Sequence, residues 1–147
     1  LGGIAAGAAT IGCSANMIGF AFASYRENKL GGVFAQGIGT SMLQVPNIVR
    51  KPIIWLPAIL TSAVLGPIST CLLKMTNNAT GSGMGTCGLV GQITTFQTMT
   101  AEGANMWIVL LEITLMHFIL PAILSLFFAE TMRKLKWIKD GDMKLDL

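Results

Sequence analysis

The chain has few charged residues, and most of them lie in short groups near the ends of apolar segments. Only 12% of its 147 residues are charged, against about 25% in soluble domains, while 52% are hydrophobic. The net charge of +3 is small, and the sequence lacks the dense basic patch that a nucleic-acid-binding face requires. The composition therefore predicts a membrane protein and argues against a nucleic-acid partner.

Residues that bind metals or carry catalysis are also scarce. The chain has a single histidine and three widely spaced cysteines, Cys13, Cys71 and Cys87. Such isolated cysteines are typical of small buried hydrophobic residues in a reducing setting. No metal or cofactor site follows from this set, and no nucleophile, base and orienting group can be assembled from it. The sequence therefore argues against an autonomous enzyme.

Long apolar runs are the main feature that is present. Residues 1–23, 53–73 and 106–128 are each long enough to cross about 30 Å of hydrocarbon. The first is rich in small residues, beginning with the pair Gly3 and Gly7, and such rows allow close helix packing. We expect this helix to pack inside a bundle, where Asn16 needs a partner or a cavity. Gly66-Pro67 is expected to kink the second span, and Pro121 lies inside the third.

Basic residues predict the orientation of these spans. They occur in the connection at residues 24–52 and in the tail at residues 131–147, which carry Arg26, Lys29, Arg50 and Lys51, and Arg133, Lys134, Lys136 and Lys139. Both regions are cytoplasmic by the positive-inside rule, and two crossings separate them, so one topology satisfies both. The sequence predicts a membrane-embedded part, residues 1–130, and a cytoplasmic basic tail, residues 131–147. No signal peptide is apparent, and the chain is expected to be the C-terminal piece of a longer protein.

The stretch at residues 77–103 is dense in glycine and threonine and nearly free of charge. In lipid, non-helical backbone is tolerated only where it is buried in protein or lines a watery cavity. Glycine bends freely and exposes its amides, while threonine adds hydroxyl groups. We therefore expect a re-entrant or cavity-lining loop that contacts a polar solute. The apolar, glycine-broken residues 31–43 are too short to cross and are expected at the interface or dipping into the membrane.

These two glycine-rich regions share a short pattern. Residues 37–43, GIGTSML, match residues 83–89, GMGTCGL, as GxGT(S/C)xL, and each copy precedes a span with a late proline. Paired glycine-interrupted segments in corresponding positions are typical of transporter binding sites. A repeat and a chance match in glycine-rich sequence remain equal alternatives.

Polar residues in and beside the third span are candidates for solute binding. Charged groups at mid-bilayer cost roughly 2.5 to 3.5 kcal/mol, so they need an inward-facing partner. Glu112 and His117 are five residues apart and lie on different faces of a helix, so we do not expect them to pair. His117 suits either a neutral interhelical contact or a solute. The candidate site comprises the acids Glu102 and Glu112, His117, and the neutral Asn77, Asn78, Thr86 and Gln92.

Three strings resemble a known family: GCSANMIGFAFASYRENKLGG, AQGIGTSMLQVPNIVRKP and LGPISTCLLKMTNNATGSGMGTCGLVGQ. They are similar to enzyme IIC, the membrane permease of the bacterial phosphoenolpyruvate-dependent sugar phosphotransferase system, in its perfringolysin-regulator-like branch. The resemblance covers roughly residues 2–128. It implies a multi-pass, commonly dimeric protein of the bacterial inner membrane that passes a sugar to phosphorylated cytoplasmic IIB/IIA-type components. The chain is shorter than a typical enzyme IIC, which suggests half of a larger transport domain.

The sequence thus predicts an all-α integral membrane protein of about three transmembrane helices with glycine-rich re-entrant or interfacial loops. The leading hypothesis is translocation of a sugar or similar polyol, with Glu102 or Glu112 accepting hydroxyl hydrogen bonds and His117 orienting. A membrane-bound regulator or sensor that binds a solute or partner without transport is the alternative. A weaker third possibility is a scaffold whose glycines serve helix packing alone.

Overall fold

The computed structural model describes residues 2–139 and 141–145, and this part of the chain contains helices and no strand. Three of its helical segments are long and apolar enough to cross a membrane: Gly3–Ala23, Pro52–Leu73 and Met106–Lys134. The predicted all-α integral membrane fold with three spans is confirmed. The third span was predicted to end at residue 128, but its helix continues to Lys134.

Two of the spans change their helical geometry beside a proline. The first is one helix, α1 (Gly3–Ala23). The second consists of η3 (Pro52–Trp55), α4 (Leu56–Pro67) and the π-helix η4 (Ile68–Leu73), and the third of α7 (Met106–Ile113), the π-helix η6 (Thr114–Ile119) and α8 (Leu120–Lys134). Pro67 directly precedes η4, and Pro121 follows η6 by two residues. Because proline has no N–H, it interrupts the hydrogen-bond ladder at both places.

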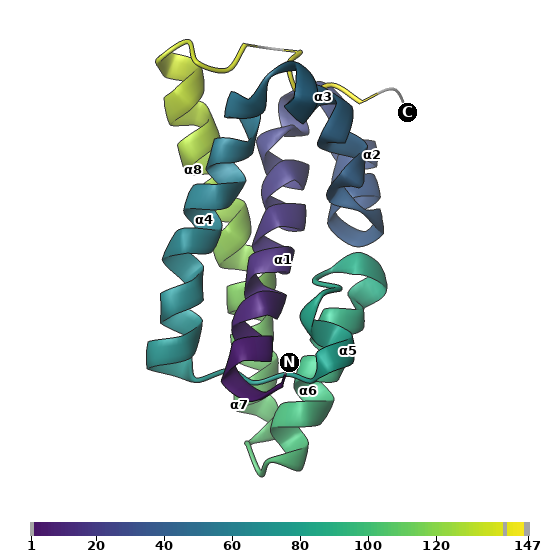
Figure 1. The fold of residues 1–147 in the computed structure, drawn as a ribbon, viewed down its shortest axis with the longest axis vertical. Coiled ribbons are helices and arrows are strands. Elements are labelled where there is room, and N and C mark those ends of the chain that lie inside the picture. The colour runs from purple at the N-terminus through teal and green to yellow at the C-terminus, as the bar shows by residue number, and fades with distance from the viewer. Residues whose placement is uncertain (1, 140, 146–147) are drawn as a thin grey trace.

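The helix α1 is the central element of the bundle. It packs against both α4 and α8, which also contact each other, and lies at the centre of the view (Figure 1). Within the most apolar window of each span, 61% of the residues of α1 are buried, against 28% and 33% for the second and third spans. Its row of small residues accounts for this close packing. The expectation that the first span lies inside the bundle is confirmed.

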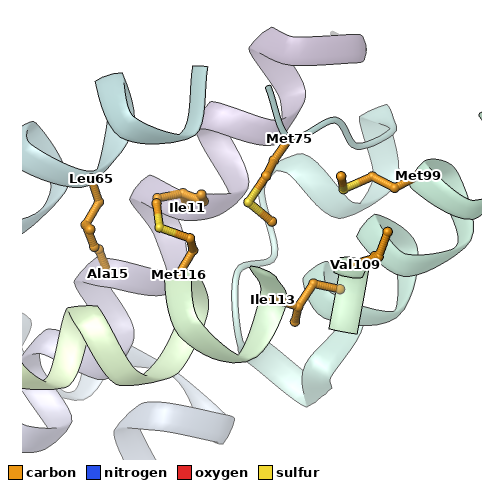
Figure 2. Packing of buried hydrophobic residues seen from close by; sticks show 8 residues of the cluster. All are labelled: Ile11, Ala15, Leu65, Met75, Met99, Val109, Ile113 and Met116. Atoms are coloured by element: carbon orange, nitrogen blue, oxygen red, sulfur yellow. The ribbon is translucent and has the colours of Figure 1, made fainter. Parts of the chain in front are cut away.

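A hydrophobic cluster fastens α1 to the other elements near one end of the molecule. Figure 2 shows side chains of α1 facing those of the second and third spans, with a methionine from the connection after η4 and one from α6 completing the cluster. The buried members are Ile11, Ala15, Leu65, Met75, Met99, Val109, Ile113 and Met116. Flexible methionine side chains fill the irregular space between these short elements.

Between the spans, the chain makes two helical hairpins beside α1. Hairpin one, residues 25–50, comprises α2 (Tyr25–Phe34), the π-helix η1 (Ala35–Gly39), η2 (Ser41–Gln44) and α3 (Val45–Arg50). Hairpin two, residues 79–101, comprises α5 (Ala79–Ser82), η5 (Cys87–Leu89) and α6 (Val90–Ala101). They lie along opposite halves of α1, and their turns, η1 and η5, are in contact (Figure 1). The two hairpins thus approach each other tip to tip along α1.

The glycine- and threonine-rich stretch is more helical than the sequence suggested. Non-helical backbone was expected over residues 77–103, but α6 accounts for residues 90–101. Its buried residues Gln92, Thr95 and Met99 are spaced at three and four positions and so form one helical face. Burial of that face against the bundle outweighs the weak helix propensity of glycine and threonine.

Two glycines allow hairpin two to approach α1 closely. Gly85 has φ +55°, and a Cβ atom there would lie 2.8 Å from the Cβ of Cys13 and 2.9 Å from the amide nitrogen of Ser14. A Cβ on Gly91 would lie 2.3 Å from the carbonyl oxygen of Gly85 within the hairpin and 3.1 Å from Cγ2 of Thr10 on α1. Any larger residue would push the hairpin away from α1.

The C-terminal segment packs against the other end of the bundle. A second cluster of buried apolar side chains comprises Ala23, Ile54, Ala129, Met132, Ile138 and Met143. The side-chain amide of Asn28 donates to the carbonyl of Met143 at 2.8 Å and accepts from the amide of Leu145 at 2.7 Å. Residues 137–139 and 141–145 therefore lie across the base of hairpin one.

Candidate functional site

The two GxGT sequences form the tips of the two hairpins and meet beside α1. In each copy the threonine is the N-cap of a 3₁₀ helix: Thr40 precedes η2 and Thr86 precedes η5. The buried hydroxyl of Thr86 donates a short hydrogen bond to the carbonyl oxygen of Gly37 in the other tip. The copies thus share a 3₁₀ helix after the threonine, although the glycines of the first copy lie in a π-helix and those of the second in a turn. Both tips contact residues in the middle of the first span.

A cavity of about 260 Å³ lies where the tips meet α1. Its lining comes from α1 and from both GxGT segments: Cys13, Asn16, Met17, Thr40, Ser41, Met42, Gly83, Met84 and Cys87. Apolar walls with a few placed polar groups are typical of small-molecule sites. Of the residues named from the sequence as candidate ligands, none lines this cavity, although Thr86 lies between two that do.

Asn16 supplies the main polar group of the cavity. Its side-chain nitrogen donates to the hydroxyl of Ser41 at 3.0 Å, and its oxygen accepts from the indole nitrogen of Trp55 at 3.4 Å. The amide therefore joins α1 to the tip of hairpin one and to the start of the second span. The partner and the cavity that Asn16 was expected to need are both present.

Gln92 and His117 form a separate polar cluster that joins α6 to η6 and α1. The side-chain nitrogen of Gln92 lies 2.9 Å from Nδ1 of His117 and 3.2 Å from the hydroxyl of Ser14. His117 is only 1% exposed. In the tautomer in which Nδ1 accepts from Gln92, the imidazole proton lies on Nε2.

Three candidate residues carry buried polar atoms without a hydrogen-bond partner in the described part of the chain: Oε1 of Gln92, Oε2 of Glu112 and Nε2 of His117. Buried polar groups are normally paired, so each such atom is a place for water or a ligand. Glu112 and His117 make no hydrogen bond with each other among the described residues, as their helical positions suggested. The polar cluster thus retains donor and acceptor capacity beside the third span.

The remaining candidates lie at the base of hairpin two, away from its tip. Asn77 is buried and donates to the hydroxyl of Thr10 at 2.7 Å, and Asn78 is exposed and caps α5 by accepting from the amide of Gly81 at 2.9 Å. Glu102 is exposed and accepts from the hydroxyl of Thr76 at 2.6 Å. Each of these side chains has a local structural role, and the structure does not bring them to the cavity.

Sequence reasoning missed Asn16, Thr40 and Ser41 as candidate site residues. A signal was present, because Asn16 is an isolated amide in an apolar span and the other two belong to the first GxGT copy. What the sequence did not show is that hairpin one brings that copy to α1. The described residues contain no group of three or more residues suited to hold a metal ion.

Three candidate spans and two opposed hairpins, with a cavity between the hairpin tips that carries a few polar groups, define an integral membrane protein with a candidate site beside α1. The chain matches the family described as "Phosphotransferase system, EIIC" over residues 1–145, and it belongs to that family. It is therefore a permease component of a phosphotransferase system, with a general role in transport alongside IIA and IIB components. No curated protein and no solved structure matches it significantly.

Proposed function

We propose that this chain moves a sugar or similar polyol across the bacterial inner membrane as the IIC component, with phosphorylation occurring on a partner IIB/IIA-type subunit. The meeting of the two GxGT tips around a cavity beside α1 is the observation that carries the proposal. A perfringolysin-regulator-like subgroup and a cytoplasmic C-terminal tail belong to the same proposal. So does a homodimer, because the second and third spans leave most of their surface for lipid or a second copy.

The chemistry of the cavity suits an uncharged, hydroxyl-bearing solute. Asn16 offers a donor and an acceptor, and the hydroxyls of Thr40 and Ser41 can reverse their roles as the solute requires. The methionine side chains supply apolar contact surface, and the polar groups fix the orientation of the solute. Separation of the tips would open the cavity toward one side at a time, which alternating access requires. The unpartnered atoms of Glu112, Gln92 and His117 offer further contacts beside the third span.

Uptake into membrane vesicles tests this proposal. With the phosphorylated partner and a panel of labelled sugars, the Asn16→Leu variant should lose accumulation at least tenfold, because an acceptor and a donor are lost together. Ser62→Ala is the matched control, since Ser62 bonds to the carbonyl of Ala58 in its own helix and lies outside the cavity. Glu112→Gln should likewise abolish uptake while insertion is retained. Full accumulation by the Asn16 variant would remove the cavity from the transport path.

A regulator or sensor is the second candidate, and one feature favours it. Gln36 lies next to Gly37 in the tip of hairpin one, and its side-chain oxygen accepts from Gln44 at 2.8 Å. Gln44 also donates to the carbonyl of Met143 in the C-terminal segment at 2.9 Å. This chain of hydrogen bonds connects the tip of hairpin one to the tail. Two results together would favour regulation over transport. Solute binding would change the conformation of the tail, and vesicles would accumulate no solute, whether or not the phosphorylated partner is present.

A further inference from the structure

A basic pocket lies where the last turn of α8 meets the start of α2, at the tail end of the bundle. Its volume is about 500 Å³, and its lining consists of Arg26, Glu130, Arg133, Lys134, Lys136, Ile138 and Lys139. The pocket is distinct from the cavity between the hairpin tips and shares no residue with it. A pocket with this excess of positive charge favours an anionic ligand.

Two of the cations in the pocket are already neutralised within the protein. Arg26 pairs with Glu130 at 2.7 Å, and the buried Arg133 pairs with Glu27 at 2.9 Å. Lys134, Lys136 and Lys139 form no salt bridge with any residue that the structure describes. Three ammonium groups therefore remain at one edge of the pocket to meet a ligand.

An apolar groove lies deeper along the same helices. It has a volume of about 390 Å³ and is lined by α1, hairpin one and the third span through Ile18, Phe22, Val33, Phe34, Gly37, Ile38, Phe118, Ile119, Ala122 and Ile123. These residues offer only apolar side chains and one glycine, so a water-soluble solute has nothing to bond there. A hydrocarbon chain is the ligand that such a surface favours.

The groove and the basic pocket follow one another on the same face of α8. Ala122 and Ile123 line the groove, and Arg133 and Lys134, eleven residues further on, line the pocket. Eleven residues complete three helical turns plus about 20°, so the two pairs of residues lie on the same face of α8. They are separated by about 16 Å along the helix axis. On the facing side, Phe22 lines the groove and Arg26, four residues later, lines the pocket.

This spacing agrees with the depth of a lipid in a bilayer. The headgroup region adds only about 5 to 8 Å to each side of the hydrocarbon core, so a point about 16 Å below a headgroup phosphate is occupied by an acyl chain. Trp137, which is 51% exposed, follows Lys136 beside the pocket, and tryptophan at a helix end is typical of the membrane interface. Trp55, at the start of the second span, lies at the same end of the bundle, because the adjacent Ile54 packs with Met132 and Ile138.

We propose that this face binds an anionic phospholipid, with its phosphate held by Lys134, Lys136 and Lys139 and one acyl chain in the apolar groove. Such a site explains why the basic pocket and the groove follow one another on the same face of α8, which neither a free anion nor a soluble partner requires. It is independent of which solute occupies the cavity between the hairpin tips.

Lipid retention by the full chain, measured by native mass spectrometry in mild detergent, tests the headgroup half of the proposal. Phosphatidylglycerol should bind more tightly than phosphatidylcholine. The triple variant Lys134→Gln, Lys136→Gln and Lys139→Gln should lose affinity for phosphatidylglycerol on the order of 100-fold. The control variant Lys29→Gln, Lys74→Gln and Lys144→Gln changes the net charge equally outside the pocket and should keep the wild-type affinity. Equal losses in both variants would overturn the proposal.

A second pair of variants tests the groove. Ala122→Trp fills it and should reduce retention of phosphatidylglycerol at least fivefold, whereas Ala63→Trp, on the exposed face of α4, should not. The variants are complemented by competition experiments. Inorganic phosphate at millimolar concentration should fail to displace the lipid, because phosphate cannot occupy the groove. Displacement of the lipid by phosphate alone would identify the pocket as an anion site that binds no lipid. Displacement by a phosphorylated partner domain, with no discrimination between the two lipids, would assign the pocket to a protein. Either outcome would overturn the proposal.

Discussion

At the scale of single residues, the contact between hairpin two and α1 depends on glycine. We expect Gly85→Ala to lower the free energy of unfolding by about 1 to 3 kcal/mol, because the new methyl group would meet α1 and the residue has a positive φ. Gly83→Ala is the matched control, since Gly83 belongs to the same tip, has φ −100°, and has no atom within 4 Å of the added Cβ. Thermal unfolding in detergent measures both. Equal stability of the two variants would contradict the proposed close approach.

The hydrogen bond between the tips gives a second residue-scale prediction. Thr86→Val keeps the shape of the side chain but leaves the carbonyl of Gly37 without its donor, which costs about 1 to 3 kcal/mol for a buried group. Thr86→Ser retains the hydroxyl and should keep most of the stability. Unfolding midpoints compare the two variants, and cross-linking between the tips reports whether they have separated. If the valine and serine variants have the same unfolding midpoint, the hydroxyl of Thr86 does not hold the two tips together.

Sequence reasoning found the repeated GxGT pattern but named none of the residues that line the cavity as candidate ligands, for a physical reason. The GxGT copies were visible because they repeat, and Asn16 was visible because an amide is costly inside an apolar span. Their meeting depends on hairpin one folding back along α1, a tertiary contact that no local pattern encodes. Asn77 and Asn78 were chosen for their chemistry, but the first bonds to Thr10 and the second caps a short helix. Residue type alone does not separate a ligand from a cap.

At the scale of elements, the spans were more predictable than the hairpins. A span is defined by a long apolar run, and both switches to π geometry adjoin prolines that were visible in advance. The helix α6 was not expected because glycine and threonine are weak helix formers. Its helical state follows from burial of Gln92, Thr95 and Met99 on one face, and the opposing surface is known only once the bundle has formed.

The tail is an element whose attachment should depend on pH. Burial alone would raise the pKa of Asp142, but hydrogen bonds from Lys51 and from the Lys139 amide, together with the charges of both lysines, lower the pKa below its usual value of 3.8. Because the folded pKa is lowered, the contact is fully present above the usual pKa and is lost as pH falls through the lowered one. The ion pair is partly exposed, so we expect it to contribute less than about 1 kcal/mol.

Hydrogen exchange of residues 137–145, corrected for its intrinsic pH dependence, measures this attachment. Protection should stay constant from neutral pH to about pH 4 and decrease below it. Asp142→Asn should show reduced protection already at neutral pH, and a difference that persists unchanged at pH 2 would contradict an electrostatic origin. Gln97→Asn, an exposed substitution on α6 far from the tail, is a control that should behave as the wild type.

At the scale of the whole molecule, the distribution of charge predicts how the bundle is oriented. The pairs Arg26 and Glu130, and Lys51 and Asp142, belong to the end of the bundle that carries the tail. Lys74 caps η4, and the second span ends at the opposite end of the bundle (Figure 1). Cytoplasmic ends of membrane proteins carry an excess of lysine and arginine. The orientation that places the tail in the cytoplasm also places both ends of hairpin one there, while hairpin two enters from outside.

Cysteine labelling in intact cells tests this orientation. In a background in which Cys13, Cys71 and Cys87 are replaced by serine or alanine, Lys74→Cys should react with a membrane-impermeant maleimide added outside, and Lys144→Cys should react only after permeabilisation. The expected order follows because an odd number of crossings separates the two positions: the third span lies between them, and hairpin two returns to its own side. Labelling of both positions from outside would mean that the third span does not cross, and the reverse order would invert the bundle. In either case the tail could not meet the cytoplasmic IIB/IIA-type components.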